Sequence, residues 1–129
     1  MTDDLYRDYI LEHYKRPRNF GELPHHDHDA REVNPLCGDD IGVQIVVADG
    51  RIADLRFQGQ GCAISQAAAS IASEELIGME IGEAETLDAD WMLGLLGIPV
   101  SATRRKCALL SLKVVRGALT GDNSWPTDS

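Results

Sequence analysis

The chain has 129 residues, an apolar share of 43% and a formal net charge of −9, which together predict one globular domain and argue against disorder. Such an acidic chain lacks the basic face that a phosphate backbone requires, so we do not expect nucleic acid as the main partner. No run approaches the roughly 18 apolar residues of a membrane span, and the start shows no signal peptide. With three cysteines and no export signal, we expect a cytoplasmic protein without a membrane partner.

The N-terminal segment, residues 3–15, predicts an amphipathic helix because apolar side chains recur at spacings of three and four. The helix is expected to end before Pro17, since proline disfavours helical backbone in the residue before it. On its apolar face, His13 is expected to be half-buried with a hydrogen-bond partner. Residues 19–30 predict a loop rich in Gly, Pro, His and Asp. Its run from His25 to His28 could bind a metal, but a solvated loop without fixed geometry is the main expectation.

A β-hairpin is the clearest local prediction. Residues 41–49 alternate in polarity, Asp49-Gly50 is a favoured two-residue turn, and residues 53–58 alternate again with one apolar face. Residues 30–35 predict a third, edge strand that Pro35 closes.

Helices are predicted again in the second half of the chain. An apolar stripe covers 62–77, with Gly78 as a natural C-cap; one or two short helices fall within 83–96, and a last helix covers 103–119. Because helices precede and follow the hairpin without βαβ alternation, the fold class is α+β. We expect one domain over 1–121 and a flexible tail over 122–129.

Three cysteines lie where regular elements are predicted to begin: Cys37, Cys62 and Cys107. An odd number cannot pair completely as disulfides, and the spacing is too wide for a zinc-finger knuckle. Cys62 and Cys107 are near predicted helix starts, whose partial positive charge favours the thiolate. Gly59 and Gly61 flank Cys62 and leave its approach unhindered.

Asp39 adds an oxygen two residues after Cys37. Three sulfurs and one oxygen form a tetrahedral donor set that suits zinc or an iron–sulfur cluster with one weak position. On spacing alone, unrelated buried cysteines remain an alternative. A Cys–His hydrolase is conceivable as well, although only thiol activation supports it.

The motifs around these residues resemble the U-type iron–sulfur cluster assembly family, which includes IscU, SufU and the N-terminal domain of NifU. The resemblance covers about residues 3–120 and is carried by three segments in order: Asn34-Pro35-Leu36-Cys37-Gly38-Asp39, Phe57-Gln58-Gly59-Gln60-Gly61-Cys62-Ala63-Ile64-Ser65 and Lys106-Cys107-Ala108-Leu109-Leu110.

The resemblance implies an α+β fold with a small three-stranded antiparallel sheet and helices packed on one side. It implies that Cys37, Cys62 and Cys107 receive sulfur from a cysteine desulfurase and, with Asp39 as the oxygen ligand, hold a nascent [2Fe–2S] cluster or Zn²⁺. The cluster would pass to acceptor apoproteins. We take Cys107 as the first sulfur acceptor, because its neighbours Arg104 to Lys106 are the most cationic.

Lys106 departs from the scaffold branch, which usually has histidine before its third cysteine. Lysine at this position is typical of the SUF-linked branch, and it could pair with Asp39 or steady a thiolate or persulfide. The insertion of that zinc branch between the second and third cysteines is missing here. Residues 98–104 do not reproduce the Leu-Pro-Pro-Val-Lys segment that a dedicated Hsp70 chaperone recognises, so we do not expect that chaperone as a partner.

Three hypotheses follow. The first is a cluster-assembly scaffold. The second is a zinc-dependent sulfurtransferase that uses the same four ligands. The third, ranked well below them, is a zinc-binding interaction module whose metal only stabilises the fold.

Overall fold

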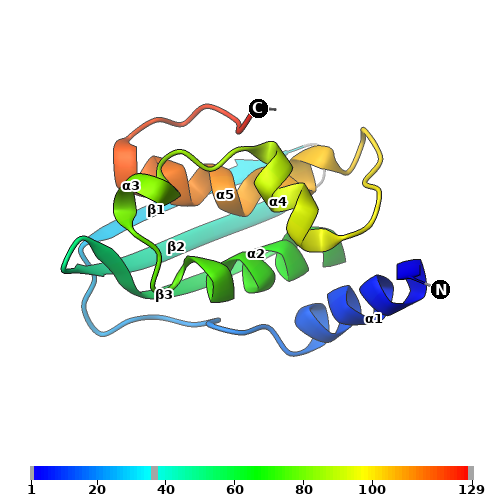
Figure 1. Ribbon diagram of the computed structural model, residues 1–129, viewed down its shortest axis with the longest axis horizontal. Coiled ribbons are helices and arrows are strands. Elements are labelled where there is room, and N and C mark those ends of the chain that lie inside the picture. Colours follow the sequence, from blue (N-terminus) through cyan, green and yellow to red (C-terminus); the bar gives the residue numbers. More distant parts are fainter. Residues whose placement is uncertain (1, 36–37, 128–129) are drawn as a thin grey trace.

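The computed structural model describes residues 2–35 and 38–127. Its chain forms one three-stranded antiparallel sheet with helices beside it (Figure 1), which confirms the predicted α+β class. The elements in chain order are α1 (Thr2–Lys15), β1 (His28–Asn34), β2 (Asp39–Ala48), β3 (Arg51–Gln60), α2 (Ala63–Leu76), α3 (Ile81–Ala84), α4 (Ala89–Leu96) and α5 (Arg105–Thr120).

The β2–β3 hairpin closes on the predicted two-residue turn. Ala48 pairs with Arg51, and between them Asp49 and Gly50 have φ angles of +55° and +74°, the positive values that a type I′ turn requires. At its open end the hairpin is longer than predicted, because Asp40 pairs with Gln60. The extra residues bring the start of β2 beside the segment that leads into α2.

β1 pairs with β2 and forms an edge of the sheet, whose strand order is β1-β2-β3. It begins at His28, two residues before the predicted start, because His28 pairs with Ile45. It ends at Asn34, which pairs with Asp39 at the start of β2. The predicted last residue, Pro35, lies outside the strand, where its missing N–H costs no ladder hydrogen bond.

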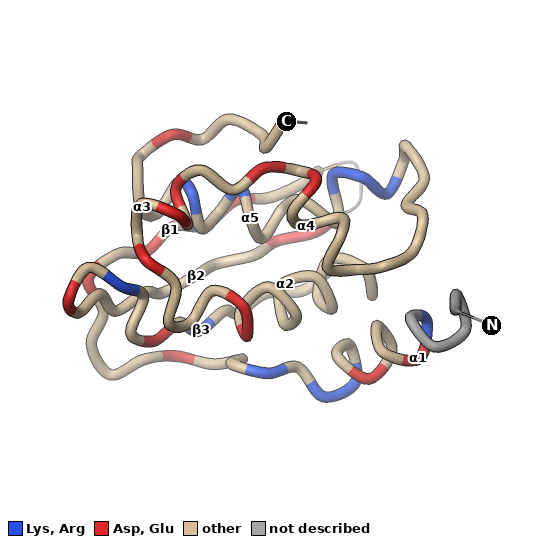
Figure 2. The backbone as a smooth tube through the Cα atoms, in the orientation of Figure 1, with Lys and Arg blue, Asp and Glu red and all other residues tan. Residues whose placement is uncertain are grey.

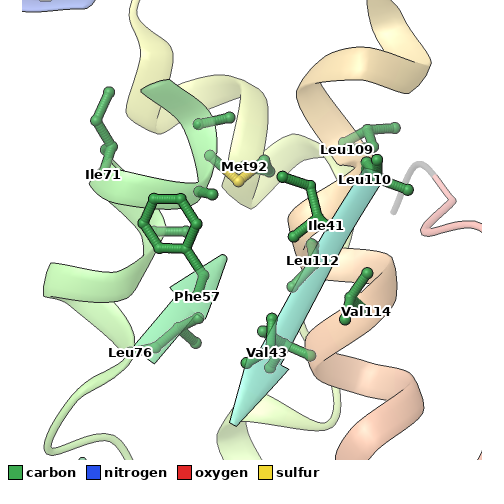
Figure 3. Close-up of a cluster of buried hydrophobic side chains, with 14 of the residues drawn as sticks. Ile41, Val43, Phe57, Ile71, Leu76, Met92, Leu109, Leu110, Leu112 and Val114 are labelled. Atoms are coloured by element: carbon green, nitrogen blue, oxygen red, sulfur yellow. The ribbon is translucent and has the colours of Figure 1, made fainter. Parts of the chain in front are cut away.

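Helices α2 and α5 cover one face of the sheet, and α1 packs along α2 (Figure 1), as the predicted one-sided packing requires. Burial alternates along β2: Ile41, Val43 and Ile45 point to the inner face and are buried, and the residues between them are partly exposed. Figure 3 shows Ile41 and Val43 beside apolar residues of β3, α2, α4 and α5, and Ile45 belongs to the same buried cluster. Burial of this aliphatic surface is the main stabilising term.

The second half of the chain follows the predicted helices with small shifts. α2 ends at Leu76 with Ile77 as the cap residue, and Gly78 follows at φ +94°. The segment 83–96 corresponds to α3 and α4, and Gly97 ends α4 in the left-handed conformation. In the described chain, no helix has the length and apolar character needed to cross a bilayer.

The C-terminal segment after α5 returns toward α4. Within it, Trp125 packs against the core, Pro126 is buried, and the carbonyl of Thr127 accepts a hydrogen bond from the N–H of Ala89 at 3.0 Å. The flexibility of this tail stays a prediction.

Candidate metal centre

Two of the three predicted thiols and the predicted carboxylate come together at the open end of the hairpin. The ligand atoms of Asp39, Cys62 and Cys107 all lie within 4.8 Å of one another. They come from β2, the start of α2 and the first turn of α5. Within the part of the chain that the structure describes, neither thiol forms a disulfide. Cys37, the fourth predicted ligand, lies outside the described residues.

Cys62 is the N-cap residue of α2, and its sulfur accepts a hydrogen bond from the N–H of Ser65 at 3.5 Å. A cap acceptor satisfies one of the free amide groups at a helix start. The cysteine side chain therefore takes the place that Ser, Thr, Asp or Asn usually occupies. This position directs its sulfur at the positive end of the helix dipole, where a thiolate is favoured.

Asp39 is fully buried, and its two oxygens differ in environment. Oδ1 accepts a hydrogen bond from the backbone N–H of Cys62 at 2.9 Å. Oδ2 has no hydrogen-bond partner among the described residues. A buried carboxylate oxygen without a partner is costly. A cation held between Oδ2 and the sulfurs would remove that cost, so the residues fit a metal or cluster iron.

The sequence suggested that Gly59 and Gly61 leave the approach to Cys62 open. The structure gives another reason why glycine occupies these two positions. A Cβ atom on Gly61 would lie 2.3 Å from Oδ1 of Asp39, and one on Gly59 would lie 1.9 Å from the carbonyl oxygen of Asp40. Their φ angles, +154° and +152°, are also ones that other residues rarely adopt. These glycines let β2 approach close enough for Asp39 to bond Cys62.

Cys107 is the third residue of α5 and is fully buried. The side chain of Asn34 donates to its sulfur, with an Nδ2–Sγ distance of 4.0 Å. Asn34 is itself buried, at 2% exposure. Sequence reasoning did not identify Asn34 as a site residue, although it is the first residue of the motif that contains Cys37 and Asp39.

Lys106 lies at the edge of this group. It is exposed, and its ammonium is 5.3 Å from the centroid of the Trp125 ring, a cation–π contact. Lys113, two turns along α5, approaches the same ring at 5.2 Å. Among the described residues, no salt bridge joins Lys106 to Asp39. Figure 2 shows a basic stretch at the start of α5, one of several on a chain with many acidic residues.

The histidines of the described chain are not members of the ligand group. His13 is buried between α1 and α2, with Nδ1 2.6 Å from Oγ of Ser70 and Nε2 3.5 Å from a carboxylate oxygen of Glu74. Burial, and secondarily the charge of Arg18, lower the pKa of His13 below its ordinary value. In the histidine-rich loop, His26 contacts Asp29 at 2.7 Å.

Comparison with known proteins agrees with this geometry. The sequence matches the family described as the NifU-like N terminal domain over residues 5–122. The iron–sulfur cluster assembly scaffold protein IscU 1 of Archaeoglobus fulgidus is 34% identical over 115 residues, which cover 89% of this chain and 74% of that protein. The zinc-dependent sulfurtransferase SufU of Bacillus subtilis is 35% identical, with 88% of each chain covered.

A solved structure shares the fold as well. The crystal structure of a candidate iron–sulfur cluster assembly scaffold protein for the SUF system from Fervidobacterium islandicum matches with a TM-score of 0.78 and 26% identity, covering 93% of this chain and 100% of that one. The chain therefore belongs to the NifU-like N-terminal domain family, in agreement with its resemblance to the IscU and SufU proteins.

Proposed function

We propose that the protein is an iron–sulfur cluster assembly scaffold that accepts sulfur from a cysteine desulfurase and passes a [2Fe–2S] cluster to apoproteins. The observation that carries the proposal is the convergence of Asp39, Cys62 and Cys107, with one buried carboxylate oxygen lacking a partner in the described chain. Cys37 is proposed as the fourth ligand from the family motif. Thiolates and a carboxylate are donors that iron accepts.

Sulfur delivery is a transfer between two cysteines. The acceptor thiolate attacks the outer sulfur of the desulfurase persulfide, the S–S bond to the desulfurase cysteine breaks, and that cysteine leaves as a thiolate. We propose Cys107 as the acceptor. Its sulfur is buried in this structure and Cys62 is partly exposed, so the proposal requires the first turn of α5 to open when the desulfurase binds.

A scaffold must also release its cargo, and Asp39 supports this role. Its Oδ1 is held by the N–H of Cys62, which leaves Oδ2 as the oxygen for iron. A carboxylate is a harder donor than a thiolate and a weaker one toward a sulfide-bound iron. We propose that this bond is the first to exchange when an apoprotein takes the cluster.

The second candidate is a zinc-dependent sulfurtransferase, favoured by the similarity to the SufU protein of Bacillus subtilis and by Lys106 before Cys107. Three thiolates and one carboxylate are a suitable zinc donor set, and bound zinc would keep the thiols deprotonated. In either function we propose that Lys106 leaves Trp125 to steady the thiolate or persulfide. Because free thiols are required, we place the reaction in the reducing cytoplasm, with no role for nucleic acid or the dedicated Hsp70 chaperone.

Anaerobic reconstitution tests the scaffold proposal. Purified protein receives ferrous iron, cysteine, catalytic desulfurase and excess dithiol, which reduces the transferred persulfide sulfur to sulfide, and is then separated from small molecules. We expect visible sulfide-to-iron charge-transfer absorption that stays with the protein, transfers to an apo-ferredoxin, and is absent from the Cys62→Ser variant. If the separated protein is colourless, the scaffold function is wrong.

Two measurements separate the sulfurtransferase from the scaffold. Metal analysis of protein purified without chelators gives the resident metal, and mass spectrometry after exposure to the desulfurase locates the persulfide. Stoichiometric zinc, faster desulfurase turnover and no transferable cluster would select the sulfurtransferase. Normal persulfide formation in Cys107→Ser would remove the acceptor role of Cys107.

A further inference from the structure

We propose that Asn34 is a positioning residue for Cys107: its side-chain amide holds the sulfur toward Asp39 and Cys62 and offsets part of the repulsion among the ligands. The inference deepens the proposed function, on which it rests. It assigns a role to a residue that supplies no ligand atom.

The position of Asn34 is fixed by the backbone. It is the last residue of β1, and it is the only residue of that strand that is buried. It pairs directly with Asp39 across the ladder, so the two side chains stand on the same face, with Cβ atoms about 5 Å apart. Pro35 follows and restricts Asn34 to extended backbone. The end of β1 therefore places the amide of Asn34 beside the ligand group.

The sulfur of Cys107 provides a hydrogen-bond acceptor for the buried amide of Asn34. An asparagine side chain has two N–H donors, and leaving them unbonded in the interior is unfavourable. The sulfur of Cys107, 4.0 Å from Nδ2, is the acceptor that the structure provides. Hydrogen bonds to an anionic acceptor are stronger than those to a neutral one, so the contact gains strength when Cys107 is a thiolate.

The neutrality of the donor matters as much as its presence. Asp39, Cys62 and Cys107 bring three potential negative charges within 4.8 Å, and their repulsion opposes assembly of the group. A lysine or arginine here would reduce the repulsion but would compete with the metal for the ligands. An amide stabilises the sulfur without neutralising it. Outer hydrogen bonds of this kind orient metal ligands and tune their affinity.

Cobalt binding tests the inference, because Co²⁺ accepts the same donors and its thiolate complexes absorb. Apo protein, wild type or variant, is titrated anaerobically at one pH. We expect Asn34→Leu, which keeps the approximate volume and removes the donor, to weaken Co²⁺ binding about 10- to 100-fold and to reduce the thiolate-to-cobalt absorption at saturation. Ser111→Ala, a buried polar change one turn beyond Cys107, is the control and is expected to bind within about twofold of wild type.

Folding is measured separately by urea unfolding of the apo forms. If Asn34→Leu does not fold, Asn34→Ser is used, since its hydroxyl is tolerated by the polar site but too short to replace the amide at the sulfur. A folded variant with wild-type affinity and spectrum overturns the role of Asn34. If the wild-type protein itself shows no thiolate-to-cobalt bands, the proposed metal centre is wrong, and this inference is wrong with it.

Discussion

Two buried polar clusters lie at different places in this domain, and they differ in how well their atoms are satisfied. Between α1 and α2, His13 bonds Ser70, Ser70 accepts the backbone N–H of Arg18 at 2.8 Å, and Asn19 donates to Ser73 at 3.0 Å. At the end of the hairpin, Asp39 keeps an oxygen without a partner among the described residues. The first cluster has its hydrogen bonds formed as folded, and the second keeps an oxygen that could accept a cation. Burial of polar groups alone therefore does not identify a site. The unpartnered oxygen of Asp39 points to one because the sulfurs of Cys62 and Cys107 lie beside that carboxylate.

Gly61→Ala would break the second cluster and is expected to have the largest effect. The added Cβ would meet Oδ1 of Asp39 at 2.3 Å, so the carboxylate must leave the N–H of Cys62. We expect Co²⁺ or zinc affinity to fall at least about 100-fold, at the upper end of the outer-shell range, measured by competition with a chromophoric chelator.

Gly78→Ala is the matched control for backbone strain. Gly78 also has a positive φ, +94°, but a Cβ there would meet no atom within 4 Å. We expect a loss of about 1–2 kcal/mol of stability and unchanged metal affinity. Equal loss of metal binding in both variants would show that strain, and not the contact with Asp39, explains the glycine at position 61.

Ser70→Ala tests the completeness of the first cluster. It removes the partner of both His13 and the Arg18 N–H, so we expect the free energy of unfolding of the apo protein to fall by about 1–3 kcal/mol, with metal affinity unchanged. Urea unfolding with a chelator present measures it. Ser111→Ala provides the comparison, because Ser111 is buried and its hydroxyl lacks a partner in the described chain; its removal is expected to cost little.

The pH dependence of the free energy of unfolding also tests the cluster between α1 and α2, through His13. Burial and Arg18 lower the pKa of His13, while Glu74 and Glu12 oppose the shift, so the unfolded chain binds the proton more readily. The contribution of neutral His13 to the stability of the fold is complete above about pH 6.5, the ordinary pKa of histidine. That contribution is lost as the pH falls through the lowered pKa of His13 in the folded protein. Urea unfolding between pH 8 and 5.5 is expected to show a smaller decline in His13→Gln. An equal decline in both proteins would assign the pH dependence to other groups.

Lys106→Gln has the smallest expected effect on the metal centre. The ammonium lies over Trp125 and not beside the ligands, so we expect metal affinity within about twofold, since an exposed charge contributes little. Persulfide formation from the desulfurase is expected to slow severalfold if Lys106 steadies the transferred sulfur. A large loss of metal affinity would instead place Lys106 among the ligands when metal is bound.

Local patterns in the sequence predict most of the fold. The Asp49-Gly50 turn and the apolar stripe of α2 are short-range features, and both are confirmed. The start of β1 differs because its limit is set by pairing with β2, and His28 carries no strand preference of its own. The motifs also lead to Asp39, Cys62 and Cys107, which the structure brings together.

Side-chain contacts between distant elements could not be read from the sequence. Asn34 meets Cys107 across 73 positions, and only the pairing of β1 with β2 and the packing of α5 bring them together. Likewise, Lys106 contacts Trp125 because the segment after α5 folds back and places that ring beside the lysine. The sequence suggested that Lys106 could pair with Asp39, but the spacing of residues does not say which way a side chain points, and Lys106 lies over Trp125 instead.

The ligand group has a consequence for the order of biosynthesis. Its described members belong to β2, α2 and α5, so their sulfur and oxygen atoms become neighbours only after loops of many residues close. A nascent chain that has not yet released α5 still lacks Cys107 at this place. We therefore expect the complete donor set to form only after α5 has packed on the sheet, so that its full affinity for a metal follows folding.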